Sequence, residues 1–438
     1  MSSFRPARLG AAACLLFSLV PPAHAGYFRV AHEGGAWWLV DGAGKPFLSK
    51  GLDVVSMGET PAKFKASNPG YCALCRYRSA EAWAQATGKR MAAWGFNTVG
   101  GHSGKEAERL VPGPFAVALT LGIWMGVPWA DPASKEAKAK YAELAGEAAA
   151  AWRNEPRLIG YFMDNELGWW DEAVFTFWLS KGWDERVKRV LWGFLAAEYH
   201  GDVRRFAADL SVTPAPKTFA DLKPELKTVK LAPGRRPLVL ERFMEWFADE
   251  YYATAAAAIR KADPNHLLLG DRYASYYSQP VARAAGRHMD VVSTNYNTFA
   301  KSGWIAPSFF DTLYRLARKP LMVTEYYFAA MENNSGNRNR SGPFMVVRTQ
   351  AERVAGARAM TERLAALPFL VGYHWFQYTD EPRFGRGDGE DFNFGVVDIQ
   401  DQPYPGLVAA FTEANGRAEA LHRAGGPSRG LRRVRGGW

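Results

Sequence analysis

Cysteine is scarce in this chain, with three residues among 438. Cys14 lies in an apolar N-terminal segment, which leaves a local pair in Cys72-Ala73-Leu74-Cys75. A zinc site is disfavoured because no second cysteine pair exists, and a redox site because the pair lies in a polar loop rather than at a strand-to-helix junction. In an oxidising compartment we expect Cys72 and Cys75 to form a local disulfide.

Long apolar runs are also missing, so no segment is expected to remain as a transmembrane helix. The N-terminal apolar stretch, Ala11 to Val20, is too short for a lasting anchor. It follows Arg5 and Arg8 and precedes the small-x-small sequence Ala23-His24-Ala25. These features predict a secretory signal peptide over residues 1–25 and a secreted or periplasmic protein.

The chain lacks a concentrated basic segment within its predicted fold. Its formal net charge is +10, and removal of the two arginines of the signal peptide, with no acids lost, takes the charge from +10 to +8. Part of this excess lies in a glycine-rich C-terminal tail, residues 425–438, which is predicted to be disordered. Nucleic-acid binding requires basic residues clustered on a folded surface, so no nucleic-acid partner is expected.

Metal-binding patterns are missing as well, because no His-x-His pair follows a predicted strand. This argues against a metal-dependent barrel hydrolase, and neither a metal nor a cofactor is expected. Aromatic residues are plentiful, with 16 tryptophans. Sugar rings present apolar C–H faces that stack on aromatic rings, although tryptophan is also good core material. An exported, aromatic-rich chain therefore favours a carbohydrate partner.

Short apolar segments alternate with helix-like segments through most of the chain. The eight apolar segments are Phe47 to Val55, Phe96 to Gly101, Phe115 to Ile123, Leu158 to Glu166, His266 to Tyr273, Met289 to Asn297, Leu321 to Phe328 and Phe369 to Tyr378. This alternation predicts an α/β fold, a closed (β/α)8 TIM barrel spanning residues 26–424. Residues 27–40 alternate around Gly34-Gly35, which predicts a short N-terminal β-hairpin that plugs the bottom of the barrel.

One connection, residues 168–247 after the fourth strand, is much longer than a barrel needs. It contains a predicted helix around Trp183 to Leu210 and a proline- and lysine-rich loop from Thr213 to Arg236. Long insertions at the C-terminal face of a barrel commonly carry function. We therefore expect a helical insertion that covers one side of the site.

Two glutamates stand at the ends of apolar strands far apart in the sequence. Glu166 ends the fourth predicted strand, and Glu325 follows Leu321 to Thr324 on the seventh. A carboxylate at the tip of a buried strand is poorly solvated and requires a reason. The two strands end on opposite sides of one barrel mouth, which suits a proton donor facing a nucleophile. Either acid alone is equally well explained by a salt bridge or a helix cap.

An Asn-Glu pair after the fourth strand and a lone glutamate after the seventh resemble the retaining (β/α)8 glycoside hydrolases of clan A. Within that clan the chain resembles the exo-acting β-agarases of glycoside hydrolase family fifty, and the likeness runs from Phe47 to Leu407. The motifs that carry it are Gly372-Tyr373-His374-Trp375-Phe376-Gln377-Tyr378, Gly385-Arg386-Gly387-Asp388-Gly389-Glu390, Pro403-Tyr404-Pro405, Asp164-Asn165-Glu166, Asp263-Pro264-Asn265-His266-Leu267 with Gly270, and Ser293-Thr294-Asn295-Tyr296.

The resemblance implies a retaining β-glycosidase that acts on agarose or a related galactan by double displacement. Glu166 is then the general acid/base and Glu325 the nucleophile. This requires an apolar surround that keeps Glu166 protonated, and hydrogen-bond donors that keep Glu325 ionised. Asn165 would hold a sugar hydroxyl beside the cleaved bond.

Further substrate contacts are expected at other strand ends. Tyr296, on the sixth strand, is expected to hydrogen-bond Glu325, with an ordinary rim tyrosine as the alternative. Trp375, on the eighth strand, is expected to form the floor on which a sugar stacks, with core packing as the alternative. The remaining candidates for hydroxyl binding are His102, His374, Arg272 and Gln377, with Asp53 a weaker one, and structural roles stay open for all of them. The acidic loop Asp388 to Asp391 is expected to be a turn braced by Arg383 or Arg386.

Two departures from the family leave the sugar, the linkage and the oligomeric state open. Only residues 26–46 separate the signal peptide from the first barrel strand, where the familiar agarases carry a carbohydrate-binding-like domain. The loop from Met331 to Arg340 is polar and does not match the agarase pattern. One alternative is a β-galactosidase-like exo-glycosidase, since Phe194 to Tyr199 resembles the helix that follows the acid/base in family forty-two. The other is a catalytically inactive carbohydrate-binding barrel.

Overall fold

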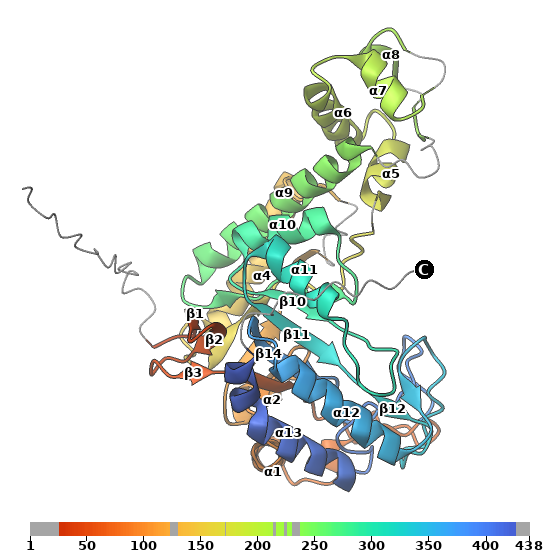
Figure 1. Ribbon diagram of the computed structural model, residues 1–438. Coiled ribbons are helices and arrows are strands. Elements are labelled where there is room, and N and C mark those ends of the chain that lie inside the picture. Colours follow the sequence, from red (N-terminus) through yellow and green to blue (C-terminus); the bar gives the residue numbers. More distant parts are fainter. Residues whose placement is uncertain are drawn as a thin grey trace, which may run out of the picture.

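The computed structural model in Figure 1 describes residues 26–122, 130–170, 172–212, 216–222, 226–229 and 237–425. The predicted signal peptide, residues 1–25, lies outside the described residues, as does the predicted tail from residue 426 onward. In the part of the chain that the structure describes, no helix has the length and apolar character needed to cross a membrane.

A nine-stranded sheet forms the centre of the fold, and all of its pairings are parallel. In sheet order the strands are β8 (Leu267–Leu268), β7 (Leu158–Phe162), β6 (Phe115–Ala118), β5 (Thr98–Val99), β4 (Ser49–Leu52), β14 (Leu370–Trp375), β11 (Leu321–Tyr326), β10 (Val292–Asn295) and β9 (Tyr273–Ala274). Each strand arises from one of the eight predicted apolar segments, and the fifth segment supplies both β8 and the start of β9. The predicted α/β class is therefore confirmed.

The two edge strands of this sheet, β8 and β9, are separated in sequence only by residues 269–272. The carbonyl of Leu268 in β8 also accepts backbone hydrogen bonds from Asp290 and Val291, which directly precede β10. The sheet is thus curled until both of its edges reach the same segment, an arrangement consistent with a TIM-like barrel.

Helices follow most strands and lie outside the sheet (Figure 1). They are α1 (Ala80–Ala93), α2 (Lys105–Leu110), α4 (Lys135–Trp152), α9 (Leu238–Ala262), α10 (Gln279–His288), α11 (Pro307–Ala317), α12 (Gln350–Ala365) and α13 (Pro405–Ala424). Side-chain caps set several of their starts: Ser79 caps α1, and Thr349 forms a capping box with Glu352 at α12. The short α2 matches the brief connection between the second and third apolar segments.

The N-terminal hairpin consists of β1 (Arg29–Glu33) and β2 (Ala36–Val40), which pair antiparallel around Gly34-Gly35 and are extended by β3 (Pro46–Phe47). Phe28 and Leu39 belong to the same buried cluster as side chains of the parallel strands, among them Ala116, Ile159, Met322 and Val371. The hairpin therefore contributes side chains to the interior of the curled sheet.

The long insertion after β7 folds into α5 (Ala173–Ser180), α6 (Arg186–Glu198), α7 (Val203–Asp209) and α8 (Phe219–Leu222). The predicted single helix is wrong: His200 and Gly201, both at positive φ, separate α6 from α7. Figure 1 shows α5 to α8 as a lobe that projects beyond the sheet at one end of the long helix α9. Much of the predicted loop from Thr213 to Arg236 lies outside the described residues.

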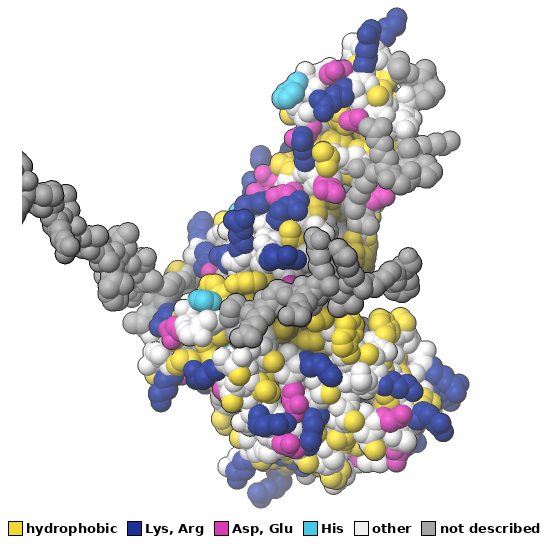
Figure 2. All heavy atoms as spheres, viewed as in Figure 1, with side chains coloured by type: hydrophobic (Ala, Val, Ile, Leu, Met, Phe, Trp, Pro, Cys, Tyr) yellow, Lys and Arg dark blue, Asp and Glu magenta, His cyan; other side chains and the backbone are white. Residues whose placement is uncertain are grey.

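A disulfide, the distribution of surface charge and the lack of a metal-binding cluster among the described residues complete the description of the fold. Cys72 and Cys75 are joined by a disulfide, with Cα atoms 5.4 Å apart. On the face shown in Figure 2, Lys and Arg side chains are dispersed among Asp and Glu rather than gathered into one basic patch. Within the described ranges, no group of three or more His, Cys, Asp and Glu residues is placed to hold a metal ion.

Candidate active site

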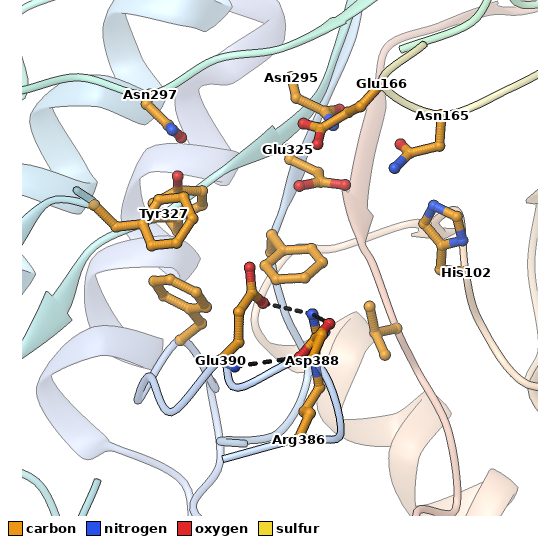
Figure 3. Close-up of a pocket in the computed structure, with 14 residues that line it drawn as sticks. His102, Asn165, Glu166, Asn295, Asn297, Glu325, Tyr327, Arg386, Asp388 and Glu390 are labelled. Atoms are coloured by element: carbon orange, nitrogen blue, oxygen red, sulfur yellow. Dashed lines mark hydrogen bonds and ion pairs between the residues drawn. The ribbon is translucent and has the colours of Figure 1, made fainter. Parts of the chain in front are cut away.

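A cavity of about 430 Å³ contains both glutamates predicted from the sequence (Figure 3). Its walls come from the C-terminal ends of the parallel strands and from the loops that follow them, the usual place for an active site in this type of fold. The lining residues are Val54, His102, Asn165, Glu166, Asn295, Asn297, Glu325, Tyr327, Phe344, Phe376, Arg386, Asp388, Glu390 and Phe394.

Glu166 reaches this cavity from the loop after β7 and is exposed to it. Asn295, at the end of β10, donates a hydrogen bond from Nδ2 to Glu166 Oε1 over 2.8 Å. Asn295 is itself fixed, because its Oδ1 accepts a hydrogen bond from the Thr324 hydroxyl at 2.8 Å. Glu166 adopts a left-handed backbone with φ of 51°, a conformation that is uncommon outside glycine and is concentrated at functional sites.

Glu325 lies near the end of β11, and its carboxylate accepts a hydrogen bond from the buried side chain of Arg272. The Arg272 guanidinium donates from Nη2 to Glu325 Oε1 and, over 2.8 Å, to Asp53 Oδ2. The side chains of Arg272 and Asp53 are fully buried, whereas that of Glu325 keeps 13% of its surface exposed to the cavity. A buried guanidinium therefore links the first barrel strand, the fifth apolar segment and the candidate nucleophile.

The charge balance of this cluster favours protonation. Asp53, Glu166 and Glu325 surround the single charge of Arg272. Burial raises the pKa of Glu325 to about 8, and the charges of Glu166 and Asp53 act in the same direction, against the opposing effect of Arg272. A pKa of about 8 for Glu325 means that this cluster holds a proton at neutral pH.

Two glycines make room for the buried cluster. A Cβ atom on Gly101 would overlap Nη1 of Arg272, and one on Gly100 would overlap Oδ1 of Asp53. Interiors are close-packed, so neither overlap can be relieved without moving the buried ion pair. The Gly100-Gly101 sequence is thus required by the close approach of Asp53 and Arg272.

Asn165 and His102 line the cavity, as expected from the sequence. The Oδ1 atom of Asn165 is buried and makes no hydrogen bond to any described residue. His102 lies beside Asn165 (Figure 3). Enclosure by the cavity wall lowers the pKa of His102 to about 4, and the nearby charge of Arg272 adds to this effect. His102 is therefore neutral at pH 7 and can exchange hydrogen bonds with a sugar hydroxyl.

Tyr296 and Trp375 do not face the cavity, so their expected direct contacts are wrong. The Tyr296 hydroxyl accepts a hydrogen bond from the backbone of Ala306, and its ring packs on Phe309 and Phe310 of α11. Trp375 is fully buried, donates from Nε1 to the Phe394 carbonyl and packs on Phe411 of α13. Side chains alternate between the two faces of a strand, and these two point to the helical layer.

The neighbours of those two residues supply the cavity wall instead. Asn295 directly precedes Tyr296, and Phe376 directly follows Trp375. Because side chains alternate along a strand, Asn295 and Phe376 point to the cavity instead. Tyr327, two residues after Glu325, shares its side of the chain. Alternation along a strand places these three residues opposite to their neighbours, but it does not indicate by itself which of the two faces is turned to the cavity.

Arg272, His374 and Gln377 are also outside the cavity lining, which corrects the expectation that they bind sugar directly. His374 is buried, with Nε2 at 2.9 Å from the Ser49 hydroxyl and Nδ1 at 3.3 Å from Asp53 Oδ1. His374 therefore packs against Asp53 and helps to fix the position of the Asp53–Arg272 ion pair. Gln377 is buried and donates to the carbonyl of Thr379.

An aromatic wall, defined here as Tyr327, Phe344, Phe376 and Phe394, occupies one side of the cavity. The ring of Tyr327 lies 4.4 Å from that of Phe394 and 5.4 Å from that of Phe344, measured between centroids. No local sequence pattern indicates this wall, because its members come from four separate segments. It offers apolar contact area to the C–H face of a sugar.

The acidic loop after β14 forms the side of the cavity opposite the glutamates (Figure 3). Arg386 braces it, with Nη2 at 2.8 Å from Asp388 Oδ2 and 2.6 Å from Glu390 Oε2. Nη1 of Arg386 also lies 3.4 Å from Glu381 Oε1. The expected turn braced by arginine is confirmed for Arg386, and the loop additionally lines the cavity.

Solved structures share this fold. An exo-beta-agarase structure aligns with 92% of this chain and 66% of its own, at a TM-score of 0.75 and 21% identity. The agarase AgWH50C aligns with 91% of this chain and 66% of its own, at a TM-score of 0.77 and 22% identity. No protein-family model matches the chain.

Two curated proteins match at the sequence level. Beta-agarase A from Vibrio sp. (strain JT0107) is 27% identical over 464 aligned positions, which cover 87% of this chain and 44% of that protein. The chain resembles the β-agarases. Beta-agarase B of the same strain is 27% identical over 380 positions, covering 76% of this chain and 36% of that protein. The β-agarase-like chain thus spans less than half the length of either curated relative.

The long insertion of this β-agarase-like chain does not cover the site as expected. No described residue of positions 168–247 lines the cavity. Its hydrophobic residues pack within the lobe and on α9 instead: Trp178 lies 5.6 Å from Phe243 and 5.2 Å from Phe247, measured between ring centroids. The lobe therefore lies along the direction of α9 and projects beyond the sheet (Figure 1).

Proposed function

We propose that the chain is a retaining glycoside hydrolase that cleaves a galactan of the agarose type. Glu325 is the nucleophile, and Glu166 is the general acid/base. The observation that carries the proposal is the pairing of an exposed Glu166 with a Glu325 that is held by a buried arginine in one cavity. The likeness to β-agarases supports the substrate class.

The reaction proceeds in two displacements. Glu325 attacks the anomeric carbon while Glu166 donates its proton to the leaving oxygen, giving a covalent glycosyl-enzyme. Glu166 then removes a proton from water, which releases the sugar with its original configuration. No metal or cofactor enters either step.

The location of the shared proton follows from the neighbours of each carboxyl group. Glu325 has the Arg272 guanidinium as its partner, and that contact favours the ionised form. Glu166 is exposed in the empty cavity, not enclosed by the apolar surround expected from the sequence, so a bound sugar must desolvate it. Desolvation raises the pKa of a carboxyl group. The double displacement requires the proton on Glu166 and the negative charge on Glu325 in the loaded site.

We further infer the organisation of the chain around this site. Residues 26–424 form one closed (β/α)8 domain, preceded by the signal peptide and followed by the basic tail. The enzyme is exported to the periplasm or the medium, where a polysaccharide is accessible. Asn165 Oδ1, which lacks a partner among the described residues, accepts a hydrogen bond from a sugar hydroxyl, and His102 contributes a second.

Incubation with agarose, neoagaro-oligosaccharides and aryl galactosides tests the proposal. We expect release of oligosaccharide products from agarose, with the first-formed anomer retained when the reaction is followed by proton NMR. An inverted first product would contradict the double displacement. Hydrolysis of aryl galactosides without any action on agarose would favour the β-galactosidase-like alternative. The Marinomonas ef1 β-galactosidase shares the fold, at a TM-score of 0.53 and 12% identity.

We expect kcat/KM to fall as the pH rises through about 8. The first step needs one proton on the Glu166–Glu325 pair, and that proton is lost above the raised pKa of Glu325. A kcat/KM profile from about pH 5 to about pH 10 measures this limb. Glu166→Ala, assayed on a substrate whose leaving group needs no acid, should lose the alkaline decline. A wild-type profile that stays level to the alkaline end contradicts the assignment.

Gly101→Ala is expected to lower kcat by about 10²-fold, because the added methyl group displaces Arg272 and with it Glu325. Thermal unfolding should show a lower melting temperature as well. The matched control is Gly146→Ala in α4, where an added Cβ meets nothing within 4 Å. That change should stabilise the fold by about 0.5–1 kcal/mol and leave kcat unaltered. Equal kcat values for the two variants would contradict the packing argument.

A further inference from the structure

Two exposed aromatic rings lie next to each other in loops that leave the catalytic face. Trp170 follows Glu166 by four positions and is 49% exposed, and Tyr276 follows β9 and is 38% exposed. Their ring centroids are 5.7 Å apart, and the ring planes differ by 31°. Two aromatic side chains that lie exposed side by side form an apolar surface on which the C–H face of a sugar can stack.

The local backbone is shaped to hold this pair. A Cβ on Gly168 would lie 2.7 Å from Nε1 of Trp170, so only glycine lets the indole lie this close to the loop. Ser275, directly before Tyr276, accepts a hydrogen bond at its hydroxyl from the backbone of Asn297 over 2.9 Å. Asn297 lines the cavity. The aromatic pair is therefore joined, through one backbone contact, to the wall of the candidate active site.

The position of the pair relative to Glu166 indicates which part of a substrate it faces. An acid/base residue stands beside the leaving oxygen. Trp170 is four positions beyond Glu166, and Tyr276 is four positions beyond Arg272, whose carbonyl accepts a hydrogen bond from the Glu166 backbone N–H. The aromatic pair is therefore carried by the two loops that meet at the candidate acid/base.

We propose that Trp170 and Tyr276 form a stacking platform for a sugar ring on the leaving-group side of an uncharged galactan chain. The inference rests on the proposed function, since it takes Glu166 as the acid/base. The platform gives the enzyme a preference for chains that extend past the cleaved bond, through C–H contact with the ring faces.

The test compares substrates of different length. In Trp170→Ala and Tyr276→Ala, KM for a neoagaro-oligosaccharide that extends past the cleaved bond should rise about 5- to 10-fold, as expected for the loss of one ring contact. The kcat/KM for an aryl glycoside, which has no sugar at that place, should stay at the wild-type value. Trp170→Phe and Tyr276→Phe keep the rings and should restore most of the length preference.

Phe64→Ala provides a matched control, because Phe64 is a single aromatic residue with 42% exposure in the loop after β4.

Wild-type hydrolysis of the aryl glycoside supports the proposed function independently of the platform. If Trp170→Ala then shows the wild-type dependence on length, the platform is overturned alone. A change in sedimentation behaviour of Trp170→Ala without a change in length dependence would overturn it too and assign the pair to a contact between copies. If the wild type neither cleaves nor binds any of these glycans, both proposals fail.

Discussion

Replacing Glu325 with glycine is expected to lower kcat by at least about 10⁴-fold, the scale of loss seen when a nucleophile is removed. The reaction then lacks the group that forms the covalent intermediate. The measurement is the rate of release of an aryl leaving group, followed with and without added azide. Azide fits the space left by the side chain and should restore turnover by forming a glycosyl azide of inverted configuration.

Controls for this experiment come from the same region of the chain. Glu332→Gln changes an exposed acid in the loop after β11 and should leave kcat at the wild-type level. Glu166→Gly with the same substrate and azide should give a glycosyl azide of retained configuration, because Glu325 still forms the intermediate. A Glu325 variant that is indistinguishable from the wild type in every hydrolysis assay would support the inactive carbohydrate-binding barrel in place of the hydrolase.

Replacing Arg272 with methionine is expected to destabilise the protein by about 3–5 kcal/mol, because it leaves two buried carboxylates without their partner. Asp53 and Glu325 both bond to this guanidinium. Denaturant titration measures the free energy of unfolding. Adding Asp53→Asn to Arg272→Met should recover part of the loss, since it removes one of the unpaired charges.

The control for Arg272 is Arg242→Met. Arg242 forms an ion pair with Glu198 at 2.8 Å, and its side chain is 62% exposed. Loss of an exposed pair of this kind costs little stability, because water and salt screen the two charges. If Arg272→Met unfolds at the same denaturant concentration as Arg242→Met, the buried cluster does not hold the barrel mouth together. The activity of Arg272→Met should fall as well, because the ionised form of Glu325 loses its stabilising partner.

The strands and the two glutamates could be predicted from the sequence because each depends on local pattern. An apolar run of strand length followed by a carboxylate needs no knowledge of distant residues. The disulfide between Cys72 and Cys75 is local in the same sense.

The facing of side chains at the strand tips could not be predicted. The pairing of β10 with β11 shifts register between Thr294 and Asn295, and that of β11 with β14 shifts between Val323 and Tyr326. An irregularity of this kind changes which residues face inward. Tyr296 and Trp375 are predicted from their position at a strand tip alone, which does not say on which face of the strand each side chain lies.

The arrangement of the cavity loops and the direction of the insertion could not be predicted for a different reason. The aromatic wall and the Arg386 loop are assembled from segments that meet only through the tertiary fold, so no short window contains their pattern. The direction of the lobe depends on α9, which packs on α4 and α10. The amphipathic pattern of a helix indicates that it packs, but not where its far end points.

The fit between the Gly100-Gly101 turn and the buried ion pair has a consequence for how this site can diverge. No larger side chain is tolerated at either glycine while Asp53 and Arg272 are present. Neither charged residue can be lost alone, because the other would remain buried without its partner. Single substitutions at these four positions are therefore all deleterious, and accepted changes must arrive together. Distant homologues should keep all four residues or replace them as a set, so the four positions would co-vary even where the surrounding loops have diverged freely.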